Sequence, residues 1–224
     1  MPPFHVERPV EKTLTDALFS GAQAVGVELT PAQLDQLGRF LDQLLVWNKK
    51  VNLTAISDPL QAVEGHLVDS LAAVPEVRGV PSILDLGAGG GFPSIPLAVV
   101  LPESRFVLAD AVGKKVGFLK AAIAGLGLKN AQAVHVRAEG DPQKEKLPVC
   151  RLAICRAFMP LPEWLKLAPA YVEEGGSIVA MLGPEATIPS PLPEGLSLVS
   201  ERSYSLPASK ASRRIVVFRK NAAG

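Results

Sequence analysis

A glycine-rich turn follows an apolar run directly, and this junction constrains the fold more than any other part of the chain. The run Ser82–Leu86 predicts a buried strand, and Gly87 and Gly89 let the backbone bend sharply where no Cβ atom keeps a ligand away. A second apolar strand leads to Asp110, 23 residues after Gly87. In doubly wound sheets a carboxylate at such a position accepts ribose hydroxyl groups. This order predicts a nucleoside site at the carboxyl ends of parallel strands.

Strands and helices alternate after Gly79, which is typical of an α/β fold with a parallel sheet. Two further β-rich runs, separated by a loop without helical periodicity, predict a C-terminal antiparallel hairpin. Five parallel strands and this hairpin would form the seven-stranded, Rossmann-like sheet of class I methyltransferases. The expected parallel strands are 82–86, 105–109, 131–136, 152–155 and 177–182, with helices at 114–124 and 161–168, a proline-rich loop at 184–195, and hairpin strands at 196–204 and 214–218.

The first 78 residues follow a helical period instead. Thr30-Pro31-Ala32-Gln33 forms a capping box with proline at the first helical position, and leucines on one helix face follow it. Asp58-Pro59 repeats the start signal for a helix whose apolar stripe we expect Pro75 to end. A weaker helix is expected over residues 14–25. We therefore expect a helical extension at 1–78, packed on a cofactor-binding domain at 79–224.

The spacing of the glycines argues against a dinucleotide. The dinucleotide fingerprint G-x-G-x-x-G requires a third glycine, but Phe92 stands there when counted from Gly87, and Ser94 when counted from Gly89. S-adenosylmethionine carries no pyrophosphate and does not need that glycine, so the spacing favours it over a nicotinamide cofactor. Asp85 is expected beneath the loop, where its carboxylate could help to hold it.

The strand before Phe158 supplies the residues expected to face the methyl acceptor. Enzymes that methylate exocyclic amines carry Asn/Asp-Pro-Pro-Tyr/Phe here, whereas this chain has Cys155-Arg156-Ala157-Phe158. Apolar neighbours make Cys155 typical of a core thiol rather than a nucleophile. An acceptor with a free lone pair, such as guanine N7, needs neither a polar residue that hydrogen-bonds an amino group nor a general base. Arg156, orienting the cofactor carboxylate or the acceptor base, and Phe158, stacking on that base, are the candidate catalytic residues.

The net charge and the number of cysteines exclude some classes of function. The net charge is +1, so bulk electrostatics do not indicate a nucleic-acid binder. The segment Arg202–Lys220, however, holds six basic residues and no acidic one, which suits either phosphate binding or a charged edge strand. Two cysteines are too few for a disulfide framework or a zinc site, so no metal is expected. Without a membrane-length apolar run or a secretory signal, we expect a cytoplasmic protein and no membrane partner.

Three stretches carry a closer resemblance. They are Trp47-Asn48-Lys49-Lys50-Val51-Asn52-Leu53-Thr54-Ala55-Ile56 with His66 and Asp69; Asp85-Leu86-Gly87-Ala88-Gly89-Gly90-Gly91-Phe92-Pro93 with Asp110 and Gly113-Lys114-Lys115; and Arg137-Ala138-Glu139 with Arg156-Ala157-Phe158. Together they resemble the bacterial small-subunit ribosomal RNA guanine-N7 methyltransferases, also called glucose-inhibited division protein B. The chain departs from that pattern at Ser94, at Ala111-Val112, and at Met181-Leu182-Gly183, where a common lysine is missing.

The resemblance implies a set of site residues. It places cofactor contacts at Gly87, Phe92, Asp110, Ala138, Glu139 and Arg156, to which the loop geometry adds Gly89. It also implies that Trp47, Asn48, Lys49, Asn52, His66 and Asp69 brace or flank the mouth of the site, although Asn52, His66 and Asp69 are equally compatible with plain inter-helix hydrogen bonding. Ala138 and Glu139 follow the third strand, where an adenine ring would lie; a solvated surface loop is the alternative.

The implied function is S-adenosylmethionine-dependent methylation of N7 of a guanine in small-subunit ribosomal RNA, by a monomer acting on the RNA or on the small ribosomal subunit. Expected RNA-binding residues are Lys49, Lys114, Lys115, Lys210, Arg213 and Arg214. The alternatives are a methyltransferase with another RNA, protein or small-molecule acceptor, a non-catalytic S-adenosylmethionine-binding protein, and a nicotinamide-dependent oxidoreductase. The missing third glycine and the terminal hairpin argue against the last of these.

Overall fold

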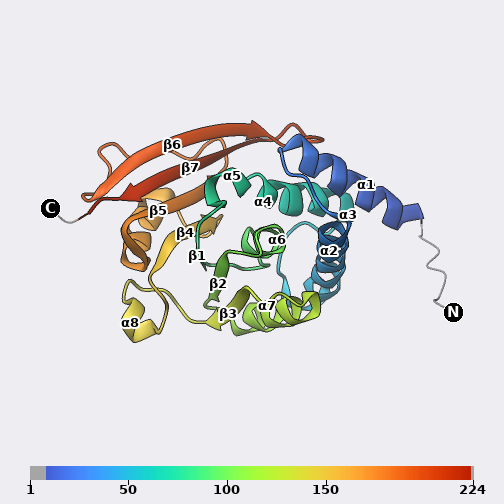
Figure 1. The fold of residues 1–224 in the computed structure, drawn as a ribbon, viewed down its shortest axis with the longest axis horizontal. Helices are drawn as coiled ribbons and strands as arrows, with labels where there is room; N and C mark the ends of the chain where they lie inside the picture. Colours follow the sequence, from blue (N-terminus) through green and yellow to red (C-terminus); the bar gives the residue numbers. More distant parts are fainter. Residues whose placement is uncertain (1–8, 223–224) are drawn as a thin grey trace.

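The computed structural model describes residues 9–222, which form helices around one seven-stranded sheet (Figure 1). The strand order is β3-β2-β1-β4-β5-β7-β6. Strands β1 to β5 run parallel, and β7 pairs antiparallel with both β5 and β6. This confirms the predicted fold class, hairpin included. The strands are β1 (Ser82–Leu86), β2 (Arg105–Asp110), β3 (Ala131–His135), β4 (Cys150–Arg156), β5 (Val172–Leu182), β6 (Leu196–Ser205) and β7 (Ser212–Lys220).

The chain before β1 is helical, as expected, but less regular. The predicted capping box is present: the Thr30 amide donates to Gln33 Oε1 (2.9 Å) and the Gln33 amide donates to Thr30 Oγ1 (3.3 Å). The expected helix after Asp58 runs from Pro59 to Leu71, but residues 63–68 form a π-helical turn within it. It ends before Pro75, which lies in the first turn of the next short helix, where a missing N–H costs nothing. The elements are α1 (Pro9–Ala24), α2 (Pro31–Val51), α3 (Pro59–Ala62), η1 (Val63–Val68), α4 (Asp69–Leu71) and α5 (Val74–Val77).

Two hydrophobic clusters cover the two faces of the sheet, since successive strand residues point to opposite faces. Ile83 faces a cluster shared with the N-terminal helices, α6 and α7, whereas Leu84 faces Trp164 and Tyr171 on the other side. The helical extension and the sheet therefore share one core, and the boundary at residue 78 stays a prediction. The remaining helices are α6 (Ser94–Val100), α7 (Gly113–Leu126), α8 (Pro142–Glu145), α9 (Leu161–Leu167) and the 3₁₀ turn η2 (Ala168–Tyr171).

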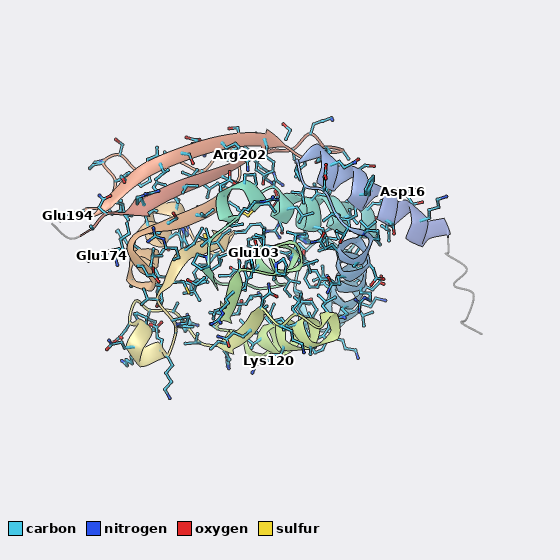
Figure 2. The ribbon with its side chains drawn as sticks, viewed as in Figure 1. Asp16, Glu103, Lys120, Glu174, Glu194 and Arg202 are labelled. Atoms are coloured by element: carbon cyan, nitrogen blue, oxygen red, sulfur yellow. The ribbon has the colours of Figure 1, made fainter. Side chains whose placement is uncertain are left out.

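Carboxylates of the helical layer hold the C-terminal hairpin, which arches over α4 and α5 (Figure 1). Glu76 accepts from Arg202 at 2.7 Å, and Figure 2 marks Arg202 where the hairpin meets this layer. Asp69 Oδ1 accepts from the Tyr204 hydroxyl at 2.7 Å, and Glu64 accepts from the amides of Ala208 and Ser209. Within residues 9–222, no helix combines the length and the apolar character that crossing a bilayer requires.

Candidate active site

Two pockets open at the carboxyl ends of the central strands and share a wall formed by Gly87, Lys115 and Ala157. The first pocket, about 460 Å³, lies toward the helical extension and the hairpin, and the second, about 500 Å³, lies toward β2 and β3. The first is lined by residues that include Thr54, His66, Asp69, Phe92, Arg156, Tyr204 and Arg213, the second by residues that include Asp110, Ala138, Glu139 and Phe158. A long ligand could occupy both.

Asp110 ties the glycine loop to the edge of the second pocket. Its carboxylate accepts from the amides of Gly89 (2.9 Å) and Val112 (2.8 Å) and is only 7% exposed. The amides of Gly87 and Ala88 both donate to the carbonyl of Ala109. A carboxylate has about four lone-pair positions, so Asp110 retains acceptor capacity for a ligand hydroxyl. The glycine loop and the carboxylate that were predicted from spacing thus lie in direct contact.

A buried tyrosine and a glutamate shape the loop that carries Ala138 and Glu139. The carboxylate of Glu145 accepts from the amides of Glu139 (2.8 Å) and Asp141 (3.0 Å) and from the Tyr171 hydroxyl (2.5 Å). The Tyr171 oxygen in turn accepts from the Gly140 amide at 2.8 Å. These bonds occupy the amides of Glu139, Gly140 and Asp141 and fix the loop where Ala138 and Glu139 line the second pocket.

Phe158 lies directly over Gly87, on the side of the second pocket. Gly87 has φ +74°, and a Cβ added there would come within 2.0 Å of the Phe158 ring. The ring also contacts Trp164 edge-on, with centroids 6.3 Å apart. We expected Arg156 and Phe158 to share the acceptor site, but the structure places them in different pockets. Stacking of Phe158 on an acceptor base stays a prediction. The ring lines the second pocket, which also contains Asp110.

Ala157 explains this separation. In an extended strand, residues 156 and 158 would point to the same face of the sheet. Ala157 instead has φ +51°, a left-handed conformation that is uncommon outside glycine. The strand alternation is broken there, so Arg156 faces the helical extension and Phe158 packs with the opposite hydrophobic cluster. Backbone strain of this kind is concentrated at functional sites.

Arg156 is the centre of a polar network in the first pocket. Its Nη1 donates to the Gly65 carbonyl and to Asp69 Oδ2, each at 2.8 Å, and its Nη2 lies 3.0 Å from His66 Nδ1. The guanidinium also lies 5.1 Å from the centre of the Phe92 ring, which stacks on His66 at 4.5 Å. Burial, followed by the charge of Arg156, lowers the pKa of His66 to about 4. The imidazole is therefore neutral near pH 7.

The π-helical turn η1 brings the partners of Arg156 together. Gly65 and His66 lie within it, and Asp69 follows at once, so a carbonyl, an imidazole and a carboxylate converge on one guanidinium. π-helical turns occur frequently at functional sites. His66 and Asp69 thus line the site as the resemblance implied. Asn48 holds the loop after α2 through Thr54, whereas Trp47 packs on Phe118 at 5.7 Å.

Asp85 is buried beneath the glycine loop with no hydrogen-bond partner for either oxygen among the described residues. The carboxylate that hydrogen-bonds the glycine loop is that of Asp110, whereas Asp85 lies beside Ser94 at the end of the loop, and a holding role for Asp85 stays a prediction. Burial raises the pKa of Asp85 to about 7, although Ser94 and Arg156 nearby limit the rise. In the free protein Asp85 is therefore largely protonated below neutral pH.

We expect Asp85→Asn to flatten the pH dependence of stability between about pH 4 and 7. A raised carboxyl pKa contributes stability that is complete below the unfolded value and is lost as the pH rises through the folded value of about 7. Asparagine cannot ionise, so its free energy of unfolding should lack this decline. Urea unfolding at several pH values measures the difference, and parallel curves for the two proteins would contradict the assignment.

The six predicted RNA-binding residues do not form one group. Lys115 and Arg213 line the first pocket, while Lys49, Lys114 and Lys210 are exposed elsewhere on the surface. Arg214 points to the opposite face of β7, because neighbouring strand residues alternate. Its guanidinium pairs with Glu201 at 2.8 Å and with the carbonyl of Ala186. RNA binding by these residues stays a prediction, and the pairing of Arg214 indicates a structural role.

Sequence reasoning missed several residues that line the first pocket. Thr54 lies within the stretch that carries the resemblance, yet no role was expected for it. Tyr204 comes from the hairpin and lies 135 residues from Asp69, its hydrogen-bond partner. No local sequence pattern predicts such a pair, because only folding brings the two elements together.

The chain is similar in sequence to a family of known proteins. Residues 33–215 match the profile of the family described as rRNA small subunit methyltransferase G. A "Ribosomal RNA small subunit methyltransferase G" from Myxococcus xanthus is 50% identical over 209 residues, which cover 92% of this chain and 96% of that protein. A protein of the same name from Anaeromyxobacter sp. is 42% identical over 94% of this chain and 99% of its own length.

Solved structures support the fold at lower sequence identity. An O-methyltransferase from Bacillus cereus, solved in complex with SAH, superposes with a TM-score of 0.57 at 18% identity, covering 82% of this chain and 91% of that one. A SAM-dependent methyltransferase from Aquifex aeolicus gives a TM-score of 0.55 at 16% identity, covering 75% and 97% of the two chains.

Proposed function

Because the chain belongs to the rRNA small subunit methyltransferase G family, we propose that it transfers the methyl group of S-adenosylmethionine to N7 of a guanine in small-subunit ribosomal RNA. The observation that carries the proposal is the pair of pockets joined at Gly87, Lys115 and Ala157. One pocket offers a carboxylate and an ordered backbone edge, and the other offers a guanidinium beside aromatic and hydroxyl groups. A nucleoside joined to a charged amino-acid tail matches both.

The residues of both pockets fit this cofactor. Asp110 would accept from the ribose hydroxyls, while the backbone at Ala138 and Glu139 would meet the adenine edge. At Gly87 a Cβ would collide with Phe158, so only a glycine lets this ring pack on the loop between the two pockets. In the first pocket Arg156 would bind the methionine carboxylate with its remaining N–H groups, while Phe92 forms the wall beneath. S-adenosylmethionine supplies an electrophilic methyl group on its sulfonium.

The first pocket has the chemistry expected for an acceptor that needs no deprotonation. Guanine N7 carries a free lone pair near neutral pH, so no residue has to remove a proton. His66 is neutral and hydrogen-bonded to Thr54, and the Asp69 carboxylate is occupied by Arg156 and Tyr204. These residues would position the reactants rather than exchange protons with them. In-line positioning can lower a barrier by about 7–11 kcal/mol at best.

For the RNA, Arg213 and Lys115 provide positive charge at the first pocket, where Arg213 Nε lies 3.8 Å from the Asp69 carboxylate. We expect Arg213→Ala to weaken binding to small-subunit RNA and to reduce the salt slope by about one phosphate contact. Arg214→Ala is the matched control: it is the next residue, its guanidinium faces the other side of β7, and it should leave the slope unchanged. Fluorescence-polarisation titrations over a range of salt concentrations measure both slopes. Equal changes in the two variants would contradict a phosphate contact at Arg213.

Mapping of methylated nucleosides tests the proposed function. Small subunits that lack the modification are incubated with the protein and S-adenosylmethionine, and their ribosomal RNA is digested for mass spectrometry. A new N7-methylguanine at one position supports the proposal. Methylation of another base or of a protein would show that guanine N7 is not the acceptor. Cofactor binding without any methyl transfer would indicate a non-catalytic protein. A ribosomal RNA acceptor would also place the protein in the cytoplasm, where we propose that it acts as a monomer.

A further inference from the structure

Thr54 lies in the wall of the first pocket, held from both sides by one amide. Asn48 Nδ2 donates to the Thr54 carbonyl at 3.0 Å, and the Thr54 amide donates to Asn48 Oδ1 at 2.9 Å. The backbone of Thr54 is therefore fixed against the end of α2, and its side chain is half-buried at the pocket. The direction of its hydroxyl hydrogen depends on the groups around its oxygen.

The first of these groups is His66, whose tautomer follows from Arg156. A guanidinium has donors only, so its Nη2, 3.0 Å from His66 Nδ1, requires a lone pair on that nitrogen. Nη1 of the same guanidinium donates to the Gly65 carbonyl. That carbonyl lies 3.0 Å from Nδ1 and would accept from it only in the other tautomer, in which the Nδ1 proton would face the Nη2 donor. The two acceptors thus face one planar fork side by side, as the two oxygens of a carboxylate do. A neutral imidazole with a free Nδ1 carries its proton on Nε2.

Among residues 9–222, the Nε2 proton of His66 has one hydrogen-bond partner. His66 Nε2 lies 2.6 Å from Thr54 Oγ1, so the imidazole donates to the hydroxyl oxygen. The Ile56 amide donates to the same oxygen at 3.0 Å. A hydroxyl has two lone pairs and one hydrogen, so both lone pairs of Thr54 Oγ1 are occupied. Its hydrogen must then point away from both donors.

We propose that Thr54 Oγ–H is a ligand-binding donor directed into the first pocket, where it binds an oxygen of the bound substrates. The proposal rests on the proposed function. Two oxygens there share the required chemistry: the carboxylate of the cofactor's methionine tail and the carbonyl next to N7 of the guanine. The charges of Arg156 and Lys115, which line the same pocket, favour an electron-rich acceptor. Arg156 sets the direction of the hydroxyl hydrogen through His66, which is itself neutral.

The tautomer of His66 gives a test that is independent of activity. Long-range ¹H–¹⁵N spectra of the uniformly labelled full chain at pH 7 show which imidazole nitrogen carries the proton, and the signal missing in His66→Gln identifies His66. We expect the proton on Nε2. A proton on Nδ1 would reverse the donor at Thr54 and overturn the proposal, whatever the protein methylates.

Thr54→Val and Thr54→Ser test the ligand bond itself. Serine retains the hydroxyl and should behave within about twofold of the natural protein, whereas valine should lose about tenfold in one of two measurements. A weaker calorimetric affinity for S-adenosylmethionine assigns the donor to the carboxylate. An unchanged cofactor affinity with a lower kcat/KM on unmethylated subunits assigns it to the base carbonyl.

Ligands without the relevant oxygen separate this bond from a structural effect of valine. Decarboxylated S-adenosylmethionine, or RNA with 2-aminopurine at the acceptor position, should not distinguish Thr54→Val from the natural protein in the measurement where the bond is made. Equal losses for the complete and the oxygen-free ligands would overturn the proposal. A natural protein that binds the cofactor but methylates no RNA would contradict the proposed function instead, and the cofactor measurement and the tautomer would still decide the role of Thr54.

Discussion

Gly87→Ala is expected to abolish cofactor binding almost completely while the protein stays folded. At φ +74° an alanine costs about 1–2 kcal/mol in backbone strain. Its Cβ would also lie 2.0 Å from the Phe158 ring, so the ring or the loop must move into the space of the ligand. Together these effects should raise the Kd for S-adenosylmethionine on the order of 100-fold, as measured by isothermal titration calorimetry.

A second glycine and a double variant provide the controls for Gly87→Ala. Gly117 lies in α7, where a Cβ would meet nothing within 4 Å, so Gly117→Ala should leave the cofactor affinity unchanged and stabilise the helix by about 1 kcal/mol. The double variant Gly87→Ala/Phe158→Ala removes the collision but keeps the strained φ, and it should bind better than Gly87→Ala alone. Unchanged affinity of Gly87→Ala would show that the ligand does not approach this loop.

Arg156→Ala is expected to reduce methyl transfer strongly and also to destabilise the fold. Its removal takes the nearer of two cations, at 2.8 Å, from the Asp69 carboxylate, whose side chain is only 5% exposed, and leaves Arg213 Nε at 3.8 Å. Breaking a buried ion pair of this kind costs about 3–5 kcal/mol. It also removes the donor that orients His66. Methyl transfer should fall on the order of 1000-fold or more, and the midpoint of thermal unfolding should drop by several degrees.

Two comparisons make the Arg156 result specific. Arg156→Lys retains the charge but cannot reach the Gly65 carbonyl, Asp69 and His66 together, so it should recover stability more than activity. Arg39→Ala breaks an exposed pair with Asp35 four residues away, and it should change stability by less than about 1 kcal/mol with no effect on transfer. Full activity in Arg156→Lys would reduce Arg156 to a source of charge.

Local sequence signals predicted the features that depend on neighbouring residues. The Thr30 capping box, the glycine loop after β1 and the carboxylate that ends β2 all follow from short-range backbone chemistry. Helix and strand identities were correct over most of the sheet, although β4, β5 and the hairpin extend beyond their apolar runs. Pairing with a neighbouring strand lengthens an element past the residues that would form it alone.

The sequence pattern predicted side-chain positions least well where elements far apart in the chain meet. Arg156 and His66 are 90 residues apart, and the tautomer of His66, and with it the direction of the Thr54 hydroxyl, follows only from their contact. The left-handed backbone of Ala157 sends Phe158 to the other pocket, against the expectation that Phe158 and Arg156 share the acceptor site. Arg213 and Arg214 were indistinguishable in a basic run, yet they lie on opposite faces of β7.

The succession of strands and helices along the chain, the glycine loop and the acid that faces it depend on hydrophobic periodicity and on backbone geometry within a few residues, so they were predictable without a structure. Which side chains share a pocket depends on how distant elements pack. Hydrogen bonds and buried charges there join the π-helical turn, the end of β4 and the hairpin, and their energies depend on distances that no spacing in the chain encodes.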